Sequence, residues 1–148
     1  MTTKNGNIMQ EREHIFAVID TAPGSTAVLD IARDAVQRGA RATLVMMFTP
    51  YDRRSIIALA EAENLTIGEA EAIYLDRAQE TYRVAVGGSD TTTIVRYRPS
   101  SAKDVLAAAV QARATALAVP SSLASHRRWR SELSKSGMPV VITPSKAA

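Results

Sequence analysis

The sequence predicts a three-layer α/β/α sandwich built on a five-stranded parallel sheet. Five short apolar or β-branched runs alternate with stretches that have helical spacing. Each run is followed within a few residues by a proline, which cannot continue the interior of a sheet. Connections long enough to hold a helix join parallel strands, so the helices are expected on both faces of one sheet.

The five predicted strands have the usual length of a β-strand and cover residues 15–19, 43–48, 92–97, 116–119 and 140–143. Residues 1–12 carry polar and charged groups without a periodic apolar set, and we expect a flexible N-terminal tail there. Residues 13–148 are expected to form one domain, because a chain of 148 residues can bury a core of ordinary size.

Local start and stop signals predict the helices. The first covers residues 26–38, with Ser25 as a candidate N-cap and Gly39 as its stop. The second connection holds two helices, over residues 52–63 and 67–86. Thr66 and Glu69 form a capping box at the start of the latter.

The last two predicted helices are shorter. One starts near Ser101, where Asp104 supplies the partner of a capping box. The other begins at either Ser125 or Ser131, and Gly137 ends it.

The net charge of +3 divides unevenly along the chain. Residues 1–88 hold nine basic and twelve acidic residues, whereas residues 89–148 hold nine and three. This asymmetry favours an anionic ligand or partner for the C-terminal half, with a solvated basic helix face as the alternative. A single tryptophan and this modest charge do not indicate a nucleic-acid-binding protein.

The absence of cysteine excludes disulfides, cysteine–zinc sites, iron–sulfur clusters and thiol nucleophiles. No stretch approaches the about eighteen apolar residues of a membrane span, and no export signal is visible. We therefore expect a cytoplasmic protein that has no membrane partner.

Ligands of such sheets bind beyond the carboxyl ends of the strands. The first strand ends at Asp20, followed by Thr21, and a carboxylate there suits a ribose hydroxyl. An Asx turn is an equally good explanation of that aspartate.

Residues 120–130, after the fourth strand, combine serines with three arginines. We expect an anion or nucleotide site there, formed with Asp20 and Thr21 by Ser121, Ser122, His126, Arg127 and Arg128. Arginines at the start of a helix oppose its dipole, and a bound phosphate would reverse that penalty. The alternative is that the helix starts at Ser131 and the arginines lie in a solvated loop, with Trp129 in packing rather than in base stacking.

Catalytic motifs are missing from the chain. There is no GxxxxGK[ST] loop, no GxGxxG after the first strand, no GxSxG elbow and no HExxH. The acidic residues Glu61, Glu63, Glu69 and Glu71 lie in predicted helices near arginines, which indicates a solvated face. We therefore predict no enzyme, no catalytic residue and no metal site.

The chain resembles the universal stress protein family over residues 13–144. The resemblance rests on residues 15–20, on 38–45, on 101–119 and on 138–142. It implies the adenine-nucleotide-hydrolase-like fold. Many members of that family bind ATP through an aspartate at the position of Asp20 and through a glycine-rich motif after the fourth strand, but this chain has no glycine from residue 89 to 136.

The resemblance and the missing glycines together favour a non-enzymatic stress-response protein that needs no cofactor and acts through partner binding. In this family the last strand commonly pairs with its twofold mate, so a homodimer through residues 139–143 is expected. The alternative function is a sensor that binds ATP, another adenine nucleotide or a different anionic small molecule at the strand ends.

Overall fold

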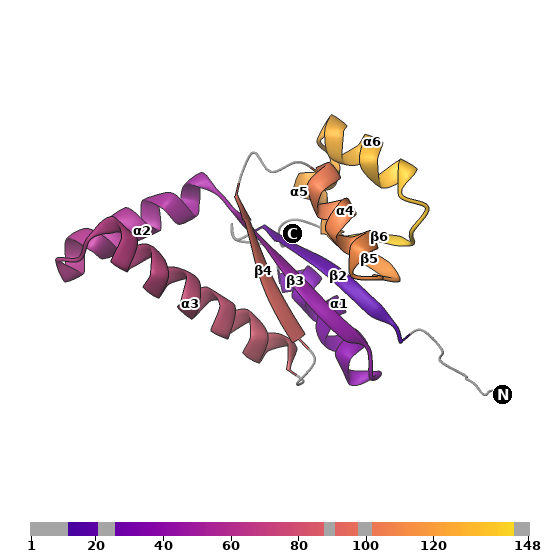
Figure 1. The fold of residues 1–148 in the computed structure, drawn as a ribbon, viewed down its shortest axis with the longest axis horizontal. Helices are drawn as coiled ribbons and strands as arrows, with labels where there is room; N and C mark the ends of the chain where they lie inside the picture. Colours follow the sequence, from indigo (N-terminus) through magenta and orange to yellow (C-terminus); the bar gives the residue numbers. More distant parts are fainter. Residues whose placement is uncertain (1–11, 21–25, 88–90, 98–101, 144–148) are drawn as a thin grey trace.

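The fold is built around a five-stranded sheet, as Figure 1 shows in a computed structural model that describes residues 12–20, 26–87, 91–97 and 102–143. The strands are β2 (His14–Asp20), β3 (Arg41–Phe48), β4 (Thr91–Tyr97), β5 (Ala116–Pro120) and β6 (Val140–Thr143). Their order across the sheet is β4-β3-β2-β5-β6, and every neighbouring pair is parallel. The predicted fold class and all five predicted strands are confirmed.

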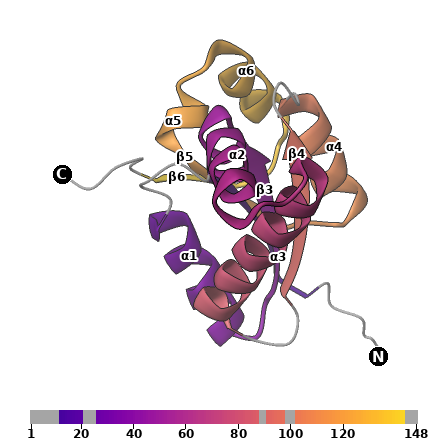
Figure 2. The same cartoon turned by 90° about the vertical axis from the view of Figure 1, so that its left-hand side faces the viewer.

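Helices cover both faces of this sheet. They are α1 (Thr26–Gln37), α2 (Pro50–Glu63), α3 (Ile67–Val86), α4 (Ala102–Gln111), α5 (Ser121–Ala124) and α6 (Arg127–Lys135). Viewed from the hairpin side in Figure 2, α1 and α4 lie on opposite sides of the sheet. The core clusters place α1 and the end of α3 against one face, and α4, α5 and α6 against the other.

The central strand β2 (His14–Asp20) is apolar from Ile15 to Ile19, and the packing shows why. Phe16 and Val18 pack in the cluster beneath α4 and α6, whereas Ile15, Ala17 and Ile19 pack in the cluster beneath α1. Successive side chains of a strand point to opposite faces, and both faces of this strand are covered. A continuous apolar run is therefore what this position requires.

The predicted cap of α3 is present in full. The backbone N–H of Glu69 donates to Oγ1 of Thr66 at 3.1 Å, and the backbone N–H of Thr66 donates to Oε1 of Glu69 at 2.9 Å. These hydrogen bonds stabilise the charged carboxylate and lower the pKa of Glu69.

The start of α2 differs from the sequence prediction, which placed it at residue 52. The helix begins at Pro50, because Thr49 is its N-cap and a proline without an N–H group fits the first helical position. Asp52 is the third helical residue and completes a capping box with Thr49. The proline that ends the preceding strand thus also starts this helix.

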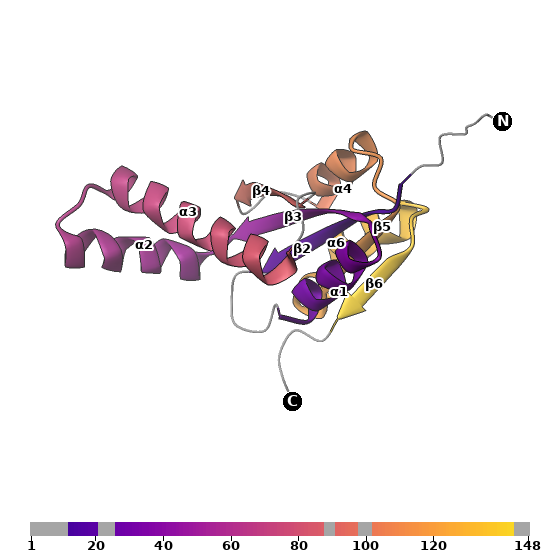
Figure 3. The same cartoon turned by 90° about the horizontal axis from the view of Figure 1, so that it is seen from below.

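Helices α2 and α3 form an antiparallel hairpin that projects beyond the carboxyl end of β3, as Figure 3 shows from below. Its interior is a small apolar cluster of Phe48, Ile56, Ala60 and Ala70. Asn64, with φ of 55°, ends α2 and turns the chain toward α3. No helix in the described part of the chain is both long enough and apolar enough to cross a bilayer.

Candidate functional site

The carboxyl ends of β2 and β5 meet where the strand order reverses. β2 lies between β3 and β5, and its register with β5 pairs Ala17 with Ala118. The pairing ends there; Asp20 is the last residue of β2, and Ser121 directly follows the last residue of β5. The topology thus places both predicted site residues at the edge of the sheet where open α/β sheets bind ligands. Thr21 lies outside the described residues.

The chain leaves β5 through one tight helical turn. Pro120 is both the last residue of the strand and the N-cap of α5, with extended backbone angles. Leu123, which is 2% exposed, anchors this turn in the core beside Ala124. Ser121 and Ser122, on the first half of the turn, are half-buried.

The backbone amides at the end of this turn are engaged within it. The N–H of Ser125 donates to the carbonyl of Ser121 at 3.0 Å, and the N–H of His126 donates to the carbonyl of Leu123 at 3.0 Å. A phosphate cradle needs several amides directed outward from a glycine-rich backbone. These two amides cannot contribute to one in this conformation.

The last helix begins at neither of the two predicted serines. α6 starts at Arg127 with His126 as its N-cap, so the alternative of arginines in a loop before Ser131 is wrong. Trp129 and Leu133, four residues apart, are both buried in the core cluster that includes α4. For both side chains to pack on the same face, the helix has to begin before Trp129. The tryptophan is therefore a core packing residue.

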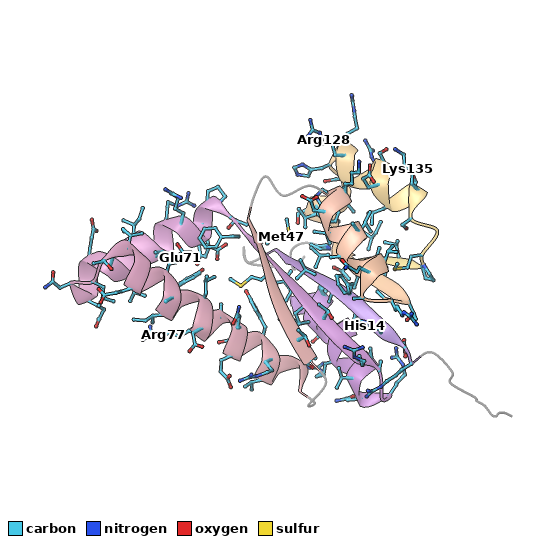
Figure 4. All side chains as sticks on the ribbon, viewed as in Figure 1. His14, Met47, Glu71, Arg77, Arg128 and Lys135 are labelled. Atoms are coloured by element: carbon cyan, nitrogen blue, oxygen red, sulfur yellow. The ribbon has the colours of Figure 1, made fainter. Side chains whose placement is uncertain are left out.

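A groove of about 360 Å³ lies between the first turns of α4 and α6. Its lining residues are Ala102, Lys103, Arg127, Arg128, Ser131 and Glu132. Three cations and one carboxylate therefore face the same space, and Figure 4 labels Arg128 on this first turn of α6. Glu132 also lies 3.9 Å from Nζ of Lys135.

Five of the seven predicted site residues thus separate into two groups. Asp20, Ser121 and Ser122 belong to the strand ends, whereas Arg127 and Arg128 line the α4–α6 groove. His126 is exposed and makes no side-chain hydrogen bond to the helix it caps. Lys103 was not predicted as a site residue, because its place in the groove depends on the packing of α4 against α6.

A buried polar network at the end of β3 also escaped the sequence analysis. The carboxylate of Asp52, fully buried, accepts hydrogen bonds from the N–H and hydroxyl of Thr49 at 2.7 and 2.8 Å and from the Tyr74 hydroxyl at 2.5 Å. Burial, with the neighbouring carboxylate, raises the pKa of Tyr74. The pattern Thr-x-x-Asp over residues 49–52 is a capping-box signal that could have revealed it.

His14 lies at the opposite, amino end of the sheet, as labelled in Figure 4. Its Nε2 lies 2.8 Å from Oγ1 of Thr43, and its Nδ1 lies 3.1 Å from the carbonyl oxygen of Ala112. Since a carbonyl can only accept, Nδ1 carries the proton and Nε2 accepts from Thr43 in the neutral ring. Burial, aided by the charge of Arg41, lowers the pKa of His14. One ring nitrogen thus joins β2 to β3 and the other joins β2 to the turn after α4, which makes this histidine structural.

No group of three or more histidine, aspartate or glutamate side chains suited to a metal ion occurs among the described residues. The chemistry that the described strand-end and groove residues offer is hydrogen bonding and positive charge. Such groups can hold an anion or a polar small molecule.

Comparisons with known proteins identify solved structures that share this architecture. No protein-family model matches the sequence, and a search of curated proteins finds no match. Among solved structures, the chain is similar to a universal stress protein in complex with cAMP, with 14% identity, a TM-score of 0.58, and coverage of 92% of this chain and 99% of that one. It is also similar to the universal stress protein from Archaeoglobus fulgidus in complex with dAMP, with 16% identity, a TM-score of 0.58, and coverage of 90% and 98%.

A further similar structure is that of the hypothetical protein PH0823, with 15% identity, a TM-score of 0.54, and coverage of 93% and 99%. The likeness extends over nine-tenths of this chain or more in all three comparisons. The resemblance noted in the sequence therefore holds at the level of the architecture, and the chain has the universal stress protein fold.

Proposed function

We propose that this chain is a non-enzymatic protein of the universal stress type that acts as a homodimer through partner binding, without the usual ATP site. The observation that carries the proposal is the direct passage of β5 into α5 at Pro120. The amides of Ser125 and His126 close that turn, where the resemblance would have required an open glycine-rich loop.

The edge strand β6 supports the dimer. In the sheet order β6 is terminal and pairs with β5 on one side. Val141 and Ile142 are 44% and 55% exposed, so two neighbouring apolar side chains of this edge strand are open to solvent. A second copy that adds its own β6 would cover these side chains and pair the open edge.

Light scattering after size exclusion tests the dimer. We expect the wild type to be a dimer at micromolar concentration and Ile142→Lys to shift it toward monomer, because a charge at the edge opposes strand pairing. Val110→Lys, at an exposed apolar residue of α4, is the matched control and should stay dimeric. A monomeric wild type would contradict the proposal.

A second candidate function is a sensor that binds an adenine nucleotide or another anionic small molecule. The groove with Lys103, Arg127 and Arg128 favours it, and two structures of the same fold are complexes with cAMP and dAMP. In this hypothesis Asp20 lies near the ribose, and Ser121, Ser122, His126, Arg127 and Arg128 lie near the phosphate.

Titration with cAMP, AMP and ATP distinguishes the two functions. Ligand at a hundred times its dissociation constant stabilises a protein by about 2.7 kcal/mol, which a melting curve detects. Binding should raise the melting temperature of the wild type, and the variant with Arg127→Ala and Arg128→Ala should lose the effect. An unchanged melting temperature at millimolar concentrations of all three nucleotides would rule out the sensor function.

The non-enzymatic part of the proposal has its own test. Phosphate release from ATP that disappears in Asp20→Ala would contradict it.

A further inference from the structure

An apolar groove lies where the α2–α3 hairpin leaves the end of β3. The groove has a volume of about 450 Å³ and runs along α2. It is lined by Phe48, Thr49, Pro50, Arg53, Ile56, Ile57, Ile67 and Glu71. Ile57 and Ile67 are 41% and 53% exposed, so large apolar side chains line it without being covered.

The exposed face of α2 beside this groove has a symmetrical charge pattern. Arg53, Ile57 and Glu61 are spaced by four residues, which puts them on one stripe of the helix. All three are exposed. A cation and an anion thus lie at equal distances on either side of an isoleucine.

Such a stripe is complementary to itself when two copies run antiparallel. A twofold axis through Ile57 sets Ile57 against its own mate and brings each Arg53 to the partner's Glu61. A parallel arrangement would instead oppose like charges. The charge pattern therefore selects a second copy in the antiparallel orientation.

We propose that α2 is a homotypic docking surface, on which the α2 helix of a second copy packs antiparallel with Ile57 at the twofold axis. The exposed side chains of Ile57 and Ile67 supply the apolar contact, and two Arg53–Glu61 pairs fix the orientation. Fourteen residues of helix span about 21 Å, so the contact is smaller than a standard interface and the association is expected to be weak.

This surface is separate from the edge strand in the proposed function. The hairpin connects β3 with β4, at one end of the strand order, whereas β6 is at the other end. With both contacts formed, β6-linked dimers would associate further through their hairpins. Experiments in the Ile142→Lys background therefore test the hairpin contact alone.

Disulfide trapping is direct because the chain has no cysteine. In the Ile142→Lys background, Ile57→Cys places a thiol at the twofold axis, where two copies can reach bonding distance. Under mild oxidation at about 100 µM we expect a covalent dimer from Ile57→Cys. Ala58→Cys, the exposed neighbour on a different face of α2, should remain monomeric. Equal cross-linking of the two variants, or none by Ile57→Cys, would overturn the proposal.

Charge reversal supplies an independent test by sedimentation. Arg53→Glu and Glu61→Arg should each weaken self-association about tenfold, since each sets like charges opposite one another in both pairs. An equimolar mixture of the two variants should regain it, because the heterodimer restores both opposite-charge pairs. Circular dichroism checks that both variants are folded. If they are, association in the mixture that is no stronger than in either variant alone would overturn the proposal.

Discussion

The hydroxyl oxygen of Tyr74 lies 2.5 Å from Oδ1 of Asp52, and this hydrogen bond joins the middle of α3 to the first turn of α2. Asp52 is fully buried and caps α2 through Thr49. One carboxylate thus holds the start of the hairpin and its second helix together.

Removing the Tyr74 hydroxyl should loosen this connection. We expect Tyr74→Phe to lower the free energy of unfolding by about 1–3 kcal/mol, because a buried charged acceptor loses a donor. Urea denaturation measures the change. Tyr51→Phe, at an exposed tyrosine on α2, should change stability by less than about 0.5 kcal/mol. Equal effects of the two substitutions would contradict the role of the hydrogen bond.

The raised pKa of Tyr74 gives an alkaline signature. Burial and the Asp52 carboxylate favour the neutral phenol in the folded state, whereas the unfolded chain releases this proton near pH 10. The free energy of unfolding should therefore be unaffected by this group below about pH 10 and fall above it. Absorbance at about 295 nm should show less tyrosine ionisation in the folded wild type than in the unfolded chain at the same alkaline pH. The same amplitude in both would refute this assignment.

His14 should make the fold less stable in mild acid. Its pKa is lowered by burial, so the unfolded chain binds a proton as the pH falls below about 6.5 while the folded chain does not. The stabilisation by neutral His14 is complete above that pH and is lost as the pH falls toward the folded-state pKa, with a slope of at most about 1.4 kcal/mol per pH unit. His14→Gln should have a flatter profile between about pH 7.5 and pH 5.5. Parallel profiles would show that another group is responsible.

Trp129 should report on the α6 contact. Its side chain is 6% exposed, so the native fluorescence should be blue-shifted and shielded from iodide. Trp129→Ala should cost about 3–5 kcal/mol, and Trp129→Phe clearly less, since a ring still fills part of the space. Arg130→Ala, at the exposed neighbour, is the control and should be close to neutral. A red-shifted native spectrum would contradict this packing.

Two glycines should respond in opposite directions to the same substitution. Gly39 has φ of 92°, so Gly39→Ala should destabilise by about 1 kcal/mol although open space surrounds the added carbon. Gly68 lies in the first turn of α3 with helical backbone and open space, so Gly68→Ala should stabilise by up to about 1 kcal/mol. Thermal unfolding measures both, and a common sign would contradict the backbone argument.

The sequence predicted the features that depend on neighbouring residues. The five strands, the parallel sheet and the Thr66–Glu69 box follow from apolar period and cap chemistry within a few positions. The predicted start of α2 at residue 52 was wrong. Pro50 marks the end of a strand, but proline also suits the first turn of a helix, and α2 begins there.

Features that need tertiary packing could not be predicted in the same way. The start of α6 depends on burying Trp129 and Leu133 against α4; their four-residue spacing is visible in the sequence, but their burial against α4 is not. The groove of Lys103 with Arg127 and Arg128 likewise joins two helices far apart in the chain. For the predicted site, the sequence could select the segments that follow the strands, but not the division of the site residues between the strand ends and the α4–α6 groove.

The hairpin also has a consequence for how this chain can change in length. Its turn at Asn64 lies beyond the sheet, and near this turn Ala60 of α2 and Ala70 of α3 are buried in the hairpin's own apolar cluster. Adding or deleting a whole helical turn in both helices at that tip would leave unchanged the contacts between α2 and α3 nearer the sheet. The tip is thus the natural place for insertions, because sequence can be gained or lost there while the strand registers remain as they are.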